Sequence, residues 1–358
     1  MRSLLRYGFL LFGIVAFAQI PTGYYDNATG TGYALKTQLY NIIKGHTTRS
    51  YNQLYVCYQT SDRDYFYEND ATILDLYSEK PGGTDSYTYS ATNTSDRCGN
   101  YSSEGDCYNR EHLMPQSVFD ENLPMVSDPH HIIPTDGKVN GMRSNFPFGV
   151  VSNPTWTSTN GSKLGNNTTP GYSQKVFEPI DEFKGDIARC IMYFGVRYQN
   201  TVGNYTHAML NGTNQQVFSD WFLPVLLQWH QQDPVSDREI ARNNAIYDYQ
   251  GNRNPFIDHP EYACIIWPAG CALANEQFSG LNTVAIYPNP SRDGRFTIQS
   301  EMALDHIEIF TINGQMIRNI DKPAFENDSF TISDLPQGFY LIRLSSQNRV
   351  TTKKLLVN

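Results

Sequence analysis

Apolar residues recur at helical spacing in several stretches of the first part of the chain. One such stretch predicts a helix over residues 35–43, with Gly45 as its C-terminal cap. A second predicts a helix over residues 183–198, whose first turn Asp181 can cap. A third helix is indicated by the capping box at Ser236–Glu239. With short strands between them, these helices predict a helix-rich α+β domain.

The pattern changes near residues 272–284, where little periodicity remains and a linker is expected. From residue 285 to residue 358, apolar and polar positions alternate in short runs separated by turn residues, which is typical of strands. Asn313 and Gly314 form a hairpin turn signal between two such runs. We therefore expect a small all-β sandwich after the helix-rich domain.

The first 18 residues have the composition of an export signal. Arg2 and Arg6 precede an apolar run that closes on the small-x-small sequence Ala16–Ala18. The apolar run over residues 7–18 is shorter than the ~20 residues that a membrane span needs. We expect a cleaved signal peptide over residues 1–18 and no stable membrane span.

Export permits disulfides, and the chain has six cysteines, none in a C-x-x-C pair. A cysteine zinc site is therefore not expected. Short loops favour pairing Cys98 with Cys107 and Cys264 with Cys271, which leaves Cys57 for Cys190. Other pairings, and buried free thiols, remain open.

Charge argues at first against a polyanionic ligand. The whole chain carries a formal charge of −9, and residues 19–282 contain 17 Lys and Arg against 28 Asp and Glu. Proteins that bind phosphate backbones usually present a basic surface. A bound divalent cation can supply local positive charge in a cleft, so a nuclease is compatible with this composition, whereas tight sequence-specific binding is not expected.

Glu111, His112 and Asn140 carry the residue types that phosphodiester hydrolysis needs. The reaction requires a base that activates water and positive charge that stabilises the crowded phosphorane. At a strand end, Glu111 and His112 can flank one site, with the carboxylate on a metal ion and the imidazole on water. The amide oxygen of Asn140 suits Mg²⁺ or Ca²⁺, and a short helix capped by Thr135 or Asp136 would present it inward.

The blocks around these residues resemble the bacterial endonuclease I family, a branch of the ββα-metal (His-Me finger) nucleases. The family's N-x-E-H-x-x-P-Q and V-N-G-x-R-S-N blocks are present as residues 109–116 and 139–145. Further similar blocks extend the resemblance over roughly residues 25–270. The resemblance implies a catalytic domain over residues 19–271 with an embedded ββα-metal finger.

The resemblance also implies roles for single residues. His112 takes the position of the general base, and Glu111 and Asn140 take those of the ligands to one divalent cation, Mg²⁺ or Ca²⁺. Arg143, three residues after Asn140, can lie on the same helical face and reach a phosphate. A structural ion pair explains Arg143 equally well. No further cofactor-binding site is expected.

Several other polar residues are weaker candidates. His130 and His131 lack the spacing of a zinc site, and we expect one to support the catalytic centre and the other to pack. Arg189 and Arg253 could contact phosphate or form structural ion pairs. The polar side chains within residues 250–254 could contact the substrate backbone or belong to a turn.

The tail resembles the C-terminal sorting domain of type IX secretion cargo in the Bacteroidetes. The resemblance rests on four segments: Tyr287–Pro290, Asn313–Gly314, Leu335–Tyr340 and Lys353–Leu355. It implies that the type IX machinery carries the chain across the outer membrane and removes the tail. The protein would then be extracellular or attached to the cell surface.

Together these features predict a secreted, nonspecific, metal-dependent endonuclease that cuts DNA, RNA or both and acts as a monomer. The same residues could hydrolyse small phosphodiesters, which is a second hypothesis. A third is a surface adhesin without enzymatic activity, delivered by its sorting tail. Nicking of circular DNA would separate the first hypothesis from the other two.

Overall fold

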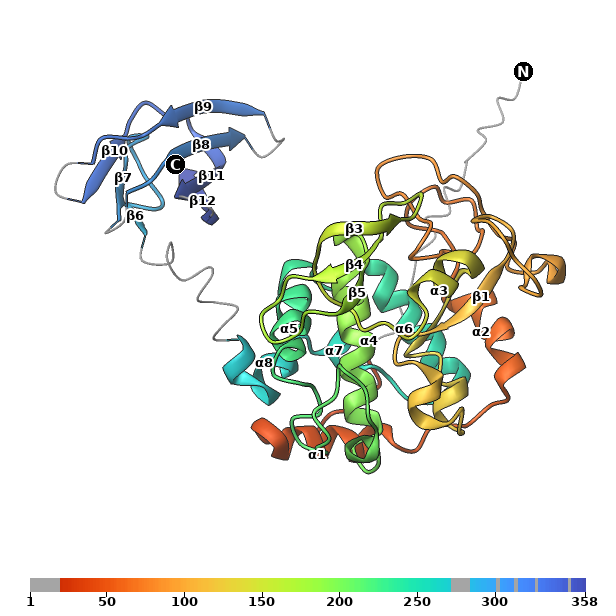
Figure 1. Cartoon of the computed structure of the whole chain (residues 1–358). Helices are drawn as coiled ribbons and strands as arrows, with labels where there is room; N and C mark the ends of the chain where they lie inside the picture. The colour runs from red at the N-terminus through yellow and green to blue at the C-terminus, as the bar shows by residue number, and fades with distance from the viewer. Residues whose placement is uncertain (1–19, 272–283, 301–302, 312–314, 326–327, 347–348) are drawn as a thin grey trace, which may run out of the picture. The chain divides into compact units, whose positions relative to one another are not determined.

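The computed structural model divides into two compact units, and the boundary between them in the sequence falls between Pro268 and Ala269 (Figure 1). The expected signal peptide and nearly all of the expected linker lie outside the described residues. None of the helices in the described part of the chain is long and apolar enough to cross a membrane. The structure describes residues 20–271, 284–300, 303–311, 315–325, 328–346 and 349–358.

The N-terminal unit is dominated by helices that pack around α4, which lies at its centre in Figure 1. Every residue of α4 after Lys184 is buried, because α1, α5 and α7 all contact it. A helix that is covered on all sides is expected in the core of a large domain. The helices of this unit are α1 Gly32–Ile43, α2 Leu54–Ser61, α3 Gly137–Arg143, α4 Lys184–Arg197, α5 Phe222–Gln232, α6 Asp237–Gln250, α7 Pro255–Asp258 and α8 Tyr262–Ile266.

Two of the predicted helix ends differ from the structure. α1 ends at Ile43 with Lys44 as its C-cap in right-handed conformation, so Gly45 does not supply a left-handed cap. Asp181 does not cap α4 either. It begins a short 3₁₀ turn, and its carboxylate pairs with Lys184 at 2.6 Å. The predicted capping box of α6 is confirmed, with both reciprocal hydrogen bonds formed between Ser236 and Glu239.

The strands of the N-terminal unit form two small antiparallel sheets. One pairs β1 Tyr108–His112 with β2 Ile132–Asp136, and the chain enters α3 directly after β2. The other has the order β3-β4-β5, with β4 in the middle. Its strands are β3 Val151–Thr157, β4 Lys163–Asn167 and β5 Lys175–Glu178.

The C-terminal unit is the predicted all-β sandwich, with sheets of strand order β10-β7-β6 and β12-β11-β8-β9. Its core is apolar and draws on both sheets, for example Phe296 from β7 and Ile342 from β11. The turn predicted at Asn313–Gly314 falls outside the described residues, and β8 and β9 pair antiparallel. The strands are β6 Ala285–Tyr287, β7 Phe296–Gln299, β8 His306–Thr311, β9 Met316–Asp321, β10 Ser329–Ile332, β11 Gly338–Ser346 and β12 Arg349–Val357.

The structure confirms one of the three expected cysteine pairings directly and contradicts another. Cys98 is bonded to Cys107, and Cys264 and Cys271 are both disulfide-bonded. The expected bridge between Cys57 and Cys190 is wrong, because both are buried free thiols. Cys57 instead contacts the Ser61 hydroxyl one turn further along α2, at 3.4 Å. Burial raises the pKa of both thiols to about 12, which keeps them protonated.

Candidate active site

The two strands and the helix that follow one another as β1, β2 and α3 bring the predicted residues together. Antiparallel pairing places His112 opposite Ile132, at the end of β1. Asp136 closes β2 and caps α3, because its Oδ1 accepts a hydrogen bond from the Val139 amide at 2.8 Å. α3 contacts both strands, so the ββα arrangement predicted from the sequence is confirmed.

The start of α3 is held against the Cys98–Cys107 disulfide. The Gly137 amide donates to the Cys107 carbonyl at 2.8 Å, and a Cβ at Gly137 would collide with the Cys98 sulfur. One turn later, a Cβ at Gly141 would meet the Tyr101 hydroxyl at 2.5 Å. A larger residue at Gly141 would displace the exposed Tyr101 ring, whereas the contacts of Gly137 with the disulfide hold the start of α3 beside β1.

A cleft of about 260 Å³ opens between the end of β1 and α3. Its lining is mostly polar and includes all of the residues predicted for the catalytic centre. The lining residues are Tyr51, Tyr101, Asn109, Arg110, Glu111, His112, Pro115, Gln116, Asn140, Gly141, Arg143, Ser144 and Asn145.

Glu111 is buried, with 2% of its surface exposed, and only one of its oxygens is paired. Oε1 accepts from the Tyr77 hydroxyl at 2.9 Å and lies 3.1 Å from the Arg143 guanidinium. No described residue donates a hydrogen bond to Oε2. Burial raises the pKa of Glu111 even though Arg143 opposes the shift. A further positive charge at Oε2 would stabilise the ionised carboxylate.

His112 is held in one orientation by a backbone carbonyl. Nε2 lies 3.2 Å from the Val126 oxygen, which can only accept, so Nε2 carries the proton. Nδ1 of the neutral ring then holds the free lone pair. Burial, together with the nearby His131, lowers the pKa of His112 to about 3, so the ring is neutral at physiological pH.

Asn140 lies on the first turns of α3, half-buried, and its side chain lines the cleft. None of the described side chains or backbone groups forms a hydrogen bond with the side-chain amide of Asn140. Its oxygen and the unpaired Oε2 of Glu111 are therefore both available to a ligand in the cleft. Carboxylate and amide oxygens are ligands that hard cations such as Mg²⁺ and Ca²⁺ prefer, so these residues fit the expected metal.

Arg143 is 1% exposed and makes most of its contacts inside the protein. Its guanidinium donates to the carbonyls of His112 and Leu113 at 2.8 and 2.7 Å, pairs with Glu111 and stacks on Phe148 at 4.6 Å. These contacts tie α3 to the end of β1. Of the two roles expected for Arg143, these contacts favour a structural ion pair over a contact with the substrate phosphate.

Arg110 is a cation of the cleft that the sequence did not single out. Its guanidinium stacks on Tyr51 at 3.5 Å and on Tyr55 at 4.5 Å, and it donates to the Tyr51 carbonyl at 3.2 Å. It remains half-buried, unlike Arg143. The sequence feature that could have identified Arg110 is its position directly before Glu111 in the N-x-E-H-x-x-P-Q block.

Comparison with known proteins agrees with this geometry. The sequence pattern of the family described as Endonuclease I matches residues 31–261, more than half of the chain. The chain belongs to the endonuclease I family. The pattern described as a secretion system C-terminal sorting domain matches residues 285–358.

Relatives of this endonuclease I protein include enzymes named for RNA and for DNA. An extracellular ribonuclease of Bacillus subtilis is 36% identical over 251 residues, which cover 68% of this chain and 78% of that protein. An extracellular ribonuclease of Bacillus amyloliquefaciens is 38% identical over 68% of this chain and 78% of its own length. A periplasmic deoxyribonuclease of Aeromonas hydrophila is 29% identical over 37% of this chain and 48% of its own length.

Membership of the endonuclease I family makes the chain an endonuclease with nucleic acid as its substrate. The sorting domain and the extracellular relatives make it a secreted or surface-attached protein. The hypotheses of a surface adhesin without activity and of an enzyme for small phosphodiesters are therefore set aside. Family members generally depend on a divalent metal ion.

The polar residues that the sequence indicated as weaker candidates for the site are buried inside this endonuclease I domain. Arg189 is fully buried and pairs with Glu239 on α6, and Arg253 pairs with Asp258. His130 and His131 are buried, and the Nε2 of each lies within 3.0 Å of a backbone carbonyl. The polar side chains within residues 250–254 are also buried and hydrogen-bonded internally. These contacts account for structural roles, and although Nδ1 of His130 and of His131 has no partner, both side chains are buried.

Tyr77 is a second residue that sequence reasoning missed. It is fully buried, and its hydroxyl donates to Glu111 at 2.9 Å across 34 positions of the sequence. It lies in an irregular stretch without periodicity, so no local pattern marks it. Only the folded chain shows that this loop supports the Glu111 carboxylate.

Proposed function

We propose that this secreted endonuclease cuts DNA, RNA or both without sequence preference, through a single divalent cation held by Glu111 and Asn140 and a general base at His112. The observation that carries the proposal is the hydrogen bond between His112 Nε2 and the Val126 carbonyl at 3.2 Å. It leaves Nδ1 as the basic nitrogen of a neutral ring beside two unpaired oxygen ligands.

His112 takes a proton from a water molecule at Nδ1, and the water oxygen attacks phosphorus. The bond from phosphorus to the 3′ oxygen then breaks, which gives a 5′-phosphate end and a 3′-hydroxyl end. The depressed pKa of His112 keeps the base unprotonated across the physiological range. The Val126 carbonyl stabilises the imidazolium that forms, because it accepts from Nε2.

The bound cation, Mg²⁺ or Ca²⁺, would supply the positive charge that stabilises the phosphorane and the departing 3′ oxygen. Arg143 keeps Glu111 in place through the 3.1 Å ion pair and therefore acts as a positioning residue. Arg110, half-buried at the cleft, supplies a cation for the substrate phosphate. The acidic composition of the catalytic domain as a whole favours a scavenging nuclease over a sequence reader.

We further propose that residues 1–18 are removed on export and that type IX secretion machinery recognises residues 285–358. The catalytic domain would then comprise residues 19–271, joined by a linker over residues 272–284. Its partners would be nucleic acid and the secretion machinery, and we expect it to act as a monomer.

The variant His112→Ala tests the proposed base. Loss of a general base typically lowers the rate by about 10²- to 10⁴-fold, whereas the fold should persist. Nicking of a closed circular plasmid by the full chain measures the rate, and circular dichroism with thermal melting measures the fold. The matched control is His306→Ala in the C-terminal unit, which should cut as the wild type does. Near-full activity of folded His112→Ala would contradict the proposal.

A further inference from the structure

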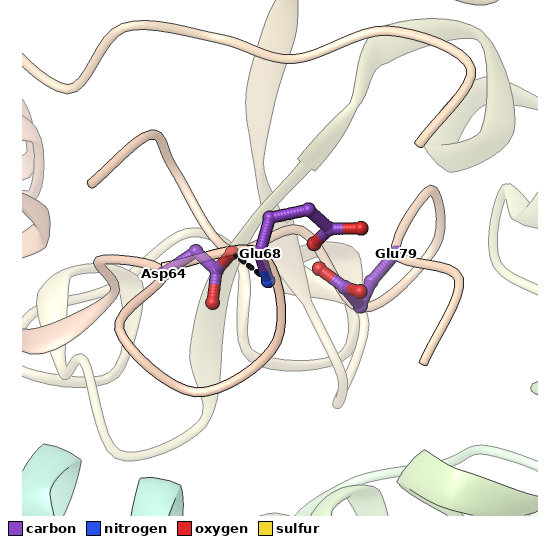
Figure 2. A group of neighbouring side chains, drawn as sticks. All are labelled: Asp64, Glu68 and Glu79. Carbon is purple, nitrogen blue, oxygen red and sulfur yellow. Dashed lines mark hydrogen bonds between the residues drawn. The ribbon is translucent and has the colours of Figure 1, made fainter. Parts of the chain in front are cut away.

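A second group of acidic side chains lies in the irregular stretch between α2 and β1, outside the catalytic cleft. Asp64, Glu68 and Glu79 each place one carboxylate oxygen within 4.8 Å of the others. Figure 2 shows Glu68 reaching toward the Glu79 carboxylate, while Asp64 lies beside the Glu68 backbone and accepts from its amide at 3.0 Å. We refer to these residues as the acidic cluster.

Two members of the acidic cluster are deeply buried. Glu79 is 1% exposed and Asp64 is 2% exposed, whereas Glu68 is exposed and closes the cluster toward solvent. Glu79 Oε1 is buried and has no hydrogen-bond partner in the structure. A buried carboxylate oxygen without a donor is costly, and native proteins rarely leave one unsatisfied.

No described basic side chain compensates this charge. Asp64, Glu68 and Glu79 take part in none of the ion pairs that the described residues form, in contrast to the buried Glu111, Glu239 and Asp258. Burial, together with the charges of nearby carboxylates, Asp85 first, raises the pKa of Glu79 to about 9. The cluster therefore lacks a positive charge at the point where its three carboxylates meet.

We propose that Asp64, Glu68 and Glu79 bind a calcium ion at a structural site separate from the catalytic cleft. The donors are all oxygens, which excludes soft metals and suits a hard divalent cation. Two oxygens on one Ca²⁺ can be as far as about 4.8 Å apart, and Ca²⁺ tolerates irregular geometry better than Mg²⁺ does. Exported proteins commonly carry Ca²⁺ sites of this kind, with affinities matched to extracellular calcium.

A cation at this site would stabilise the segment between Asp64 and Glu79, which supports the Glu111 carboxylate. Between Asp64 and Glu79 the chain carries Tyr77, which donates to Glu111 at 2.9 Å, and Asp75, which accepts from the Asp136 amide at 2.7 Å. A cation that joins Asp64 to Glu79 closes this segment at both ends. Long irregular segments are otherwise entropically costly to hold in one conformation.

Calcium titration by isothermal calorimetry tests the proposal independently of cleavage. The full chain carries Glu111→Gln in every sample, which weakens the catalytic cation site and isolates the acidic cluster. After treatment with EDTA and buffer exchange, this background should bind one Ca²⁺ and melt at a higher temperature in Ca²⁺ than in EDTA.

Two added variants decide the assignment. Glu68→Gln, at an exposed position that should not disturb folding, should weaken Ca²⁺ binding by about tenfold or more and reduce the thermal shift. Glu79→Gln should abolish both. The matched control Asp248→Asn removes an exposed carboxylate from α6 and should bind as the background does.

The proposal is overturned if the Glu111→Gln background binds no Ca²⁺, or if it binds Ca²⁺ equally well with Glu68→Gln present. Should Glu79→Gln fail to fold, the Glu68→Gln comparison alone decides. Because binding is measured without substrate, these outcomes are independent of whether His112 and Glu111 catalyse cleavage.

Discussion

Glu111 in the catalytic cleft and Glu79 in the acidic cluster are both almost fully buried, yet their surroundings differ. Glu111 has the Arg143 guanidinium at 3.1 Å and the Tyr77 hydroxyl at 2.9 Å on one oxygen. Glu79 has no ion pair, and its Oε1 has no donor. The protein thus compensates Glu111 from within, whereas no described basic side chain compensates Glu79.

This difference matches the two roles proposed for these sites, one catalytic and one structural. The catalytic cleft combines a half-satisfied carboxylate with a neutral imidazole and an opening of about 260 Å³. The acidic cluster contains no imidazole, and none of its three members lines the cleft. A cation can therefore fasten the cluster, whereas in the cleft it can also meet a substrate and an activated water.

The largest effect should follow from removing the catalytic ligand. Glu111→Gln should lower the plasmid-nicking rate by at least about 100-fold, because an amide binds a divalent cation more weakly than a carboxylate. The Mg²⁺ concentration for half-maximal rate should rise in parallel. Kinetics across a Mg²⁺ series measure both, with Asp248→Asn as the control. A reduced rate with an unchanged Mg²⁺ dependence would mean that Glu111 is not a ligand.

Removal of the internal counter-ion should mainly affect stability. Arg143→Leu leaves Glu111 without its buried partner, which typically costs about 3–5 kcal/mol. Urea unfolding of the full chain in EDTA measures the loss. Glu79→Gln in the same buffer should change the unfolding free energy much less, since Glu79 has no partner to lose. Equal losses in the two variants would remove the distinction between the two carboxylates.

Lys36 extends the comparison to an unpaired buried cation. Its ammonium donates to the Gln199 side chain at 3.0 Å and the Asn214 carbonyl at 2.9 Å, and burial lowers its pKa to about 7. Above that pH the unfolded chain holds a proton that the folded chain lacks, so the free energy of unfolding rises with pH until the ordinary lysine pKa is reached.

Lys36→Met should remove this rise, which amounts to about 1.4 kcal/mol per pH unit at most. Urea midpoints at pH 7, 8 and 9 in EDTA measure it, with the exposed Lys175→Met as the control. Parallel pH profiles for wild type and Lys36→Met would show that the ammonium stays charged in the folded chain.

The smallest effect should come from Tyr77→Phe, which removes a single hydrogen bond to Glu111. We expect a loss of about 1–2 kcal/mol in unfolding free energy and a decrease in the nicking rate of roughly tenfold or less. The exposed Tyr65→Phe is the matched control. An unchanged rate in folded Tyr77→Phe would separate the loop from the catalytic carboxylate.

Much of the fold could be predicted where the information is local. The capping box at Ser236, the Asp136 cap and the alternation of the tail strands each depend on neighbouring residues, and each prediction is confirmed. Pairing Cys57 with Cys190 by elimination was wrong, because a cysteine count cannot distinguish a bridge from two buried thiols in helices.

The reactive groups of the candidate site could be predicted from the sequence, but the side chains that hold them in place could not. Glu111, His112 and Asn140 line one cleft as expected, since two short sequence blocks fold into one ββα unit. The roles of Arg143 and Tyr77 depend on side-chain packing across the fold, which no periodicity encodes. The acidic cluster was missed for the same reason, because its members are spread along an irregular segment.

The most direct test of the central claim is incubation of the purified full chain with closed circular plasmid in Mg²⁺, Ca²⁺ or EDTA. A circular substrate has no ends, so any cut is endonucleolytic. The account predicts nicked and then linear DNA with a divalent cation and intact plasmid in EDTA. Nicking at the same rate in EDTA would contradict the claim that Glu111 and Asn140 hold a cation required for cleavage.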